Sequence, residues 1–210
     1  MTLQNRVLPD GRIAAIAARG MFMGNRGGRI HDPVTRQLTR RRWASKAWIC
    51  CVTTFNDRHR KVMGNSYTEL FFLDEVTALT AGHRPCFECQ RQRALAFATA
   101  FSKGHDLPDR ARAGAMDMVL HGQRTDPAGL RKIDPTDREL PDGIMMQAGD
   151  DQETFLVLRS DRVLHWTPQG YMDAGSRDDI GPAKLLTPAA MLAALRAGYQ
   201  PVWHRSAEDL

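Results

Sequence analysis

Two cysteines separated by two residues place the strongest constraint on this chain of 210 residues. Cys86 and Cys89 bracket a Phe-Glu pair, and this spacing allows both thiolates to reach one tetrahedral metal ion. The chain contains only four cysteines, which are too few for a disulfide scaffold. The sequence therefore predicts a zinc site in a reducing, cytoplasmic setting, and the fold must bring further ligands to the pair.

The remaining ligands must come from other segments. Residues 47–55 are rich in β-branched and aromatic side chains, which predicts a strand. Neighbouring side chains of a strand point to opposite faces, so only one of Cys50 and Cys51 can ligate while the other packs in the core. A thiol redox pair is the alternative, but no strand-helix-strand pattern precedes the motif. The candidates for the remaining ligands are Cys50, Cys51, His59, His83 and His31.

One segment resembles a known family. The residues concerned are Phe71, Phe72, Ala78, Leu79, Ala81, Gly82, His83, Arg84, Pro85, Cys86, Phe87, Glu88 and Cys89. They resemble the second half of the metal-binding domain of the Ada DNA-repair proteins. In that family a strand, an Ala-rich helix, an Ala-Gly-aromatic-Arg-Pro-Cys turn and a second cysteine close a four-thiolate zinc site. The resemblance implies zinc and a role in DNA repair or processing.

The resemblance also suggests which ligands complete the site. Counting back the family's usual spacing from Cys86 reaches Phe55 and His59, where the family has two cysteines. Phe55 cannot ligate, whereas His59 can, and Cys51 can replace the missing sulfur. The expected ligands are therefore Cys51, His59, Cys86 and Cys89. In that family one upstream cysteine also accepts a methyl group from DNA phosphotriesters, and with Phe55 at that position we expect no self-methylating activity.

Basic residues are concentrated near the N-terminus. Residues 1–65 contain 13 Lys and Arg against three Asp and Glu, whereas residues 134–210 contain seven against 13. Such an excess, with Arg40, Arg41 and Arg42 in a row, is expected of a surface that meets phosphates. Arg84 and Arg91 flank the start of a predicted helix, where a phosphate would also bind. DNA or RNA is the predicted partner, and a solvated basic face is the alternative.

A second hypothesis is an enzyme, most plausibly a hydrolase or glycosylase that acts on nucleic acid beside a structural zinc site. Asp117 and His121 are four residues apart on a predicted helix, so their side chains share a face and can form an acid-base pair. His31, next to Asp32, is a further catalytic candidate. The sequence contains no complete phosphate-binding loop, nucleophile elbow or dinucleotide fingerprint.

The remaining patterns predict an α+β fold with small antiparallel sheets, packed helices and a zinc-stabilised strand-helix unit. The Gly- and Arg-rich segment before residue 43 should be mostly loop, with a short helical candidate at residues 13–18. Further along, the sequence predicts a strand at 67–72, a helix capped by Asp74, helices at 89–102 and 108–121, a hairpin at 153–166, and a last helix capped by Thr187.

Composition separates a basic zinc-binding region, residues 1–133, from a small antiparallel β region with a C-terminal helix, residues 134–210; the two are either separate or packed as one domain. A protein-interaction module, which would use the predicted hairpin at 153–166, is a third class of function. No stretch is long and apolar enough to span a membrane, so no membrane partner is expected.

Overall fold

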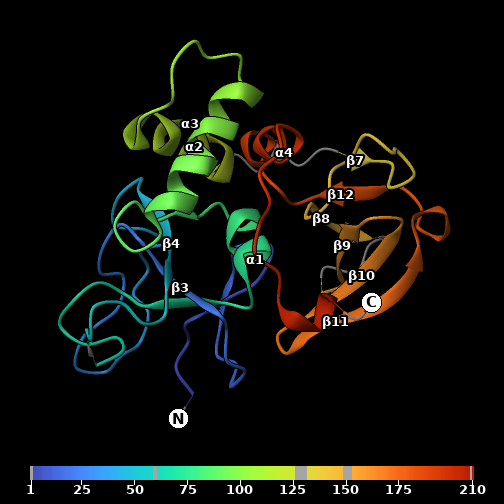
Figure 1. Ribbon diagram of the computed structural model, residues 1–210. Helices are drawn as coiled ribbons and strands as arrows, with labels where there is room; N and C mark the ends of the chain where they lie inside the picture. The colour runs from blue at the N-terminus through green and yellow to red at the C-terminus, as the bar shows by residue number, and fades with distance from the viewer. Residues whose placement is uncertain (1, 59–60, 126–131, 149–152, 209) are drawn as a thin grey trace.

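The structure, a computed structural model, describes residues 2–58, 61–125, 132–148, 153–208 and 210. Two sheets and a group of helices form an α+β fold, which confirms the predicted class (Figure 1). The α-helices are α1 (Glu75–Thr80), α2 (Arg91–Gly104), α3 (Ala113–Thr125) and α4 (Ala189–Arg196). None of the helices in these ranges is long and apolar enough to cross a membrane.

The first sheet contains the cysteine motifs and has the strand order β2-β1-β5-β3-β4-β6. Its central strands β5, β3 and β4 are antiparallel, and the short β6 joins β4 in parallel. The strands are β1 (Arg6–Val7), β2 (Ile13–Ala14), β3 (Phe22–Arg26), β4 (Trp48–Val52), β5 (Leu70–Phe72) and β6 (Arg84–Pro85).

Of two expectations for the N-terminal segment, one was wrong and the other was confirmed in part. Instead of a helix at 13–18, Ile13 pairs with Val7 in a hairpin whose turn uses Gly11 at a φ of 83°. Most of the segment before residue 43 is loop, as predicted, but residues 22–26 in the Gly-rich stretch form the central strand β3. A Cβ atom at Gly24 would lie 2.2 Å from the carbonyl oxygen of Ile49, so the glycine is needed where β3 and β4 approach closely.

The second sheet is antiparallel throughout, with the order β11-β10-β9-β8-β12-β7. The predicted hairpin is confirmed, because β9 and β10 pair around a turn at Ser160 with a φ of 53°. The strands are β7 (Lys132–Ile133), β8 (Met145–Ala148), β9 (Phe155–Arg159), β10 (Arg162–Thr167), β11 (Gly170–Ser176) and β12 (Ala183–Leu185). Two short 3-10 helices follow β11 and close the chain, at Arg177–Asp179 and Arg205–Ala207.

Two helix starts differ from prediction for reasons of tertiary structure. Helix α3 begins at Ala113 rather than at Pro108, because the backbone N–H groups of Leu107 and Ala111 both bond to Ser102 and hold residues 105–112 as a loop. Thr187 does not cap α4, because its hydroxyl accepts the N–H of Met145 at 2.9 Å.

Helix α1 joins the two sheets into one packed unit. All six of its residues are buried, and they contribute to three separate apolar clusters. Ala78 packs with the first sheet, Val76 with the second, and Leu79 with helices α2, α3 and α4. In Figure 1 this short helix lies between the sheets. Residues 1–133 and 134–210 therefore share buried contacts through α1.

Candidate metal centre

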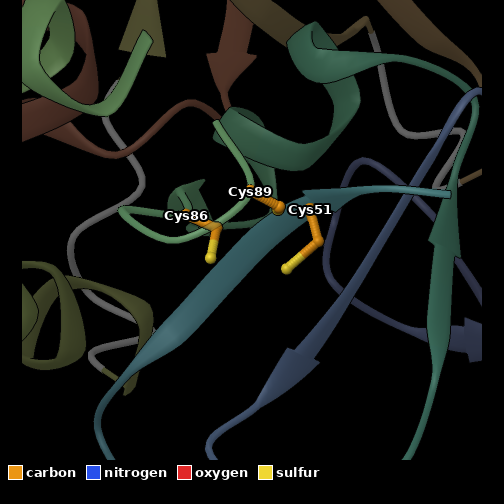
Figure 2. Close-up of side chains that lie close together, drawn as sticks. All are labelled: Cys51, Cys86 and Cys89. Atoms are coloured by element: carbon orange, nitrogen blue, oxygen red, sulfur yellow. The ribbon is translucent and has the colours of Figure 1, made fainter. Parts of the chain in front are cut away.

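Strand alternation on β4 separates the two adjacent cysteines, as the sequence predicted. Cys50 is fully buried in the apolar cluster that contains Phe72 and Ala78. Cys51 points to the opposite face, where its sulfur meets those of Cys86 and Cys89, and the three sulfur atoms all lie within 4.8 Å of one another. Figure 2 shows Cys51 reaching from the strand toward the turn with the other two cysteines.

The turn that contains Cys86 and Cys89 is held against β4 by backbone hydrogen bonds. The N–H of Cys86 donates to the carbonyl of Cys50 at 2.9 Å, and the side-chain amide of Gln90 donates to the same oxygen at 2.8 Å. The N–H of Glu88 lies 3.4 Å from the sulfur of Cys86 and donates to it. The parallel pairing of β6 with β4 thus brings the C-x-x-C motif to Cys51 and gives one sulfur a backbone donor.

Hydrogen bonds among the three clustered thiols shift their pKa values. The pKa of Cys86 is lowered, chiefly because the thiols of Cys51 and then Cys89 donate hydrogen bonds to its sulfur. The pKa of Cys51 is raised, first by its hydrogen bond with Cys86. Burial raises the pKa of Cys50, so that residue remains a thiol in the core. Within the cluster the thiolate therefore forms first at Cys86, which accepts from both neighbouring thiols.

The cluster fits a soft divalent metal ion. Two thiolates bound at about 2.3 Å to one tetrahedral ion are roughly 3.8 Å apart, which the observed spacing permits with small side-chain movements. Of the other proposed ligands, His59 lies outside the described residues. Three cysteines are thus positioned to hold a metal ion, with room for one more ligand in a tetrahedral set.

The alternative ligands have other roles. His83 is fully buried, with its ring near those of Trp48 and Phe72. His31 is hydrogen-bonded at both ring nitrogens, to the hydroxyl of Thr68 at 2.6 Å and to the carbonyl of Gly64 at 2.8 Å. These contacts give His31 a structural role and differ from the predicted catalytic one.

Asp117 and His121, the predicted acid-base pair on α3, contact side chains from other parts of the fold. Asp117 accepts two hydrogen bonds of 2.9 Å from the guanidinium of Arg84, and both side chains are buried. His121 packs edge-on against the ring of Trp43 at 5.1 Å. This ion pair also corrects the expectation that Arg84 binds a phosphate, because its guanidinium is used inside the protein.

The other predicted phosphate contacts are accessible. Arg91, at the start of α2, is exposed, and so are Arg40, Arg41 and Arg42 in the loop between β3 and β4. These four residues remain available to a polyanion.

A cavity of about 350 Å³ lies beside the three cysteines. One face of the first sheet forms its floor, since alternate residues of β3, β4 and the start of β5 point into it. The floor residues are Met23, Asn25, Ile49, Cys51, Glu69 and Phe71.

Glu69 is the functional candidate that sequence reasoning missed. Its side chain is only 2% exposed; Oε2 accepts the N–H of Met63 at 2.7 Å, whereas Oε1 has no partner among the described residues. The available signal was a single carboxylate directly before the apolar run of β5. A charged residue at a strand position that must be buried needs a hydrogen-bond partner, which the local sequence does not specify.

Fold and site together define an α+β protein with three cysteines placed to hold a metal ion beside a small cavity. No protein-family model, curated protein or solved structure matches this chain.

Proposed function

We propose that this protein binds one zinc ion through Cys51, Cys86 and Cys89, and that it binds nucleic acid through its basic N-terminal surface. The convergence of three sulfur atoms from two segments is the observation on which the metal assignment depends. Thiolates favour soft ions, and a set rich in sulfur with tetrahedral spacing is typical of zinc. The resemblance of residues 67–90 to the Ada metal-binding domain supports the same ion.

Metal analysis of the purified chain tests the first half of this proposal. We expect about one zinc per chain in protein purified without chelator, and loss of that zinc in Cys51→Ser and Cys86→Ser. Cys50→Ala is the matched control, because Cys50 is adjacent in sequence but faces the core. Wild-type protein without metal, or equal zinc loss in the control, would contradict the assignment.

Buried arginines support the proposed nucleic-acid binding, because they concentrate positive charge beneath the N-terminal surface. The guanidinium groups of Arg26 and Arg124 lie 4.1 and 4.4 Å from the ring centre of Trp48. Burial lowers the pKa of Arg26 to about 9, with repulsion from Arg42 as the next cause. Burial likewise lowers the pKa of Arg124 to about 9. Both side chains remain protonated at neutral pH, and a bound polyanion would relieve this repulsion.

The exposed basic loop lies directly over this charge. The N–H groups of Ala44 and Ser45 both donate to the carbonyl of Arg26, which fixes the loop containing Arg40, Arg41 and Arg42 against β3. Trp43, in the same loop, is 37% exposed. Arginines that contact phosphates, together with an exposed indole on which a base can stack, are typical of single-strand recognition.

Replacing Arg40, Arg41 and Arg42 by Ala tests nucleic-acid binding. We expect weaker binding to all sequences alike, and a log-log salt slope that falls by about 0.9 for each phosphate of duplex DNA that the variant no longer neutralises. The matched control removes three exposed charges from the C-terminal third: Lys184→Ala, Arg196→Ala and Arg205→Ala. Equal reductions in affinity in both triple variants would place the binding surface elsewhere.

The proposal excludes self-methylation. Phe55 occupies the expected acceptor position and lines the cavity, and Cys51 is 8% exposed. Incubation with methylated DNA followed by intact-protein mass spectrometry should show no gain of a methyl group. A stoichiometric gain that is absent in Cys51→Ser would overturn this part of the proposal.

A further inference from the structure

We propose that the exposed face of helix α3 and the neighbouring Trp43 form a base-stacking surface, so that the basic N-terminal region prefers single-stranded nucleic acid to a duplex. This inference rests on the proposed nucleic-acid function, and it adds the form of the partner and a second segment of the chain that contacts it. The surface is separate from the metal centre, because it shares none of the described residues that line the cavity beside the cysteines.

Helix α3 exposes apolar side chains on the face that it does not pack against the core. Met118 is 57% exposed and Val119 is 41% exposed, whereas Met116 and Leu120 are fully buried. Asp117 is the only acidic residue in the sequence of α3, and its carboxylate is buried in an ion pair. The exposed face of α3 is therefore apolar and carries no negative charge. Contiguous exposed apolar side chains of this kind mark an interaction surface.

The basic loop between β3 and β4 lies beside this face of α3. The ring of Trp43 meets that of His121 edge-on at 5.1 Å, and the ammonium group of Lys46 donates to the sulfur of Met118 at 3.1 Å. His121 is three residues after Met118, so both side chains lie on the side of α3 that faces the loop. Trp43 and Met118 therefore belong to one surface, which continues along the loop into the three arginines at 40–42.

The combination of positive charge with an apolar face favours a strand whose bases are unpaired. The loop arginines and Lys46 attract the phosphates of any nucleic acid, but a duplex keeps its bases stacked inside and would leave Trp43 and Met118 uncovered. A single strand exposes the faces of its bases, which stack on aromatic side chains. Burial, followed by repulsion from Arg124 and Lys46, lowers the pKa of His121, so at neutral pH its ring is uncharged. The surface thus fits a strand with its phosphates on the loop and its bases on Trp43 and α3.

Anisotropy titrations with a labelled oligothymidine of about 20 nucleotides, and with a duplex of the same length, test this preference. We expect the wild-type chain to bind the single strand at least about tenfold more tightly than the duplex at the same salt concentration. Trp43→Ala should weaken single-strand binding at least about fivefold and change duplex binding less than about twofold. Its log-log salt slope should stay unchanged, because the substitution removes no charge. Trp43→Phe keeps a ring for stacking and should bind the single strand within about threefold of wild type.

Met118→Ser and Met172→Ser form a matched pair that tests the contribution of α3. Both replace an exposed methionine, 57% exposed at Met118 and 51% exposed at Met172, but Met172 lies on β11 of the second sheet. Only Met118→Ser should weaken single-strand binding, by about threefold. Thermal melts of the same samples show whether each variant is folded. Because Trp43 also packs near Trp48, with ring centres 6.2 Å apart, the exposed Met118→Ser keeps the test decisive if Trp43→Ala does not fold.

The outcomes separate this inference from the function on which it rests. Equal affinity for single strand and duplex, or full single-strand affinity in folded Trp43→Ala or Met118→Ser, would overturn the inference and leave the proposed nucleic-acid function standing. Absence of binding to both nucleic acids would contradict the function and the inference together. Vesicles of phosphatidylcholine and phosphatidylserine form a further arm, because basic and apolar side chains on one face also suit an anionic membrane. Vesicle binding that Trp43→Ala abolishes, without a preference for single strands, would overturn the inference in favour of a membrane.

Discussion

Two groups of buried carboxylates lie close together in the sequence but differ in their partners. Asp74 accepts four hydrogen bonds, from the N–H and hydroxyl of Thr77, the hydroxyl of Tyr171 and the N–H of His204, at 2.7 to 3.0 Å. Glu75 accepts from Tyr199, Val202 and Arg93. Glu69, equally buried, accepts only from Met63 among the described residues.

The difference separates carboxylates whose oxygens are hydrogen-bonded within the fold from one that keeps an unpaired oxygen among the described residues. Asp74 caps α1, and Asp74 and Glu75 together hold β11 and the C-terminal segment against it, so their acceptor capacity is used within the fold. Glu69 lines the cavity beside the three cysteines, and its Oε1 is buried without a partner among the described residues. An unsatisfied buried group costs stability, whereas a fully hydrogen-bonded one does not.

The largest expected effect comes from removal of the metal from the three cysteines, which line the same cavity as Glu69. If free zinc is about 1,000-fold above its dissociation constant, chelation should lower the free energy of unfolding by about 4 kcal/mol. Denaturant titrations with and without chelator measure this change. Cys86→Ser should show no response to chelator. A wild-type curve that does not shift when zinc is removed would mean that the metal does not stabilise the fold.

Removal of the Asp74 carboxylate should have the next largest effect. Asp74→Ala leaves buried donors on Thr77, Tyr171 and His204 without an acceptor, so the free energy of unfolding should fall by about 3 kcal/mol. The same denaturant titration measures the loss. Asp173→Ala removes an exposed carboxylate paired with Arg162, and because solvent screens that pair the loss of stability should be much smaller than in Asp74→Ala. Equal losses in the two variants would remove the structural role assigned to Asp74.

Neutral amides test the comparison most directly, because the same chemical change is made at both sites. Asp74→Asn replaces an oxygen that accepts from the N–H of His204 by an NH₂ group, which should cost about 1 to 3 kcal/mol. Glu69→Gln retains an acceptor for Met63 and removes an unpaired buried charge, so its stability should stay within about 0.5 kcal/mol of wild type. A cost at Glu69 equal to that at Asp74 would show that Glu69 also has internal partners.

A smaller effect is expected from pH, since it changes only the protonation of groups that keep their positions. Burial raises the pKa of Asp74 in the folded protein above its unfolded value. Between these two values the folded state binds the proton more tightly, so the free energy of unfolding should decrease as pH rises through that window. Stability measured from about pH 4 upward in wild type and Asp74→Asn checks this sign. An identical pH profile in the variant would assign the dependence to another group.

Local patterns in the sequence were sufficient for part of this protein. The C-x-x-C spacing predicted two ligands, and strand alternation predicted that only one of Cys50 and Cys51 reaches the site; the fold makes it Cys51. Asp74 as an N-cap and the turn at Ser160 follow from the preferences of single residues at helix starts and hairpin turns. These features depend on neighbours a few positions away, so composition and spacing are enough to predict them.

The remaining features were decided by contacts between distant segments. Pairing of β6 with β4 brings Cys86 to Cys51 across 35 positions of sequence, and the bond between Arg84 and Asp117 removes a predicted phosphate contact and a predicted catalytic acid together. Glu69 became a candidate only when β3, β4 and β5 placed it in a cavity with no internal partner for one oxygen among the described residues. Burial and hydrogen-bond satisfaction are properties of the packed chain, because the groups that exclude water from a side chain come from segments that its local sequence does not specify.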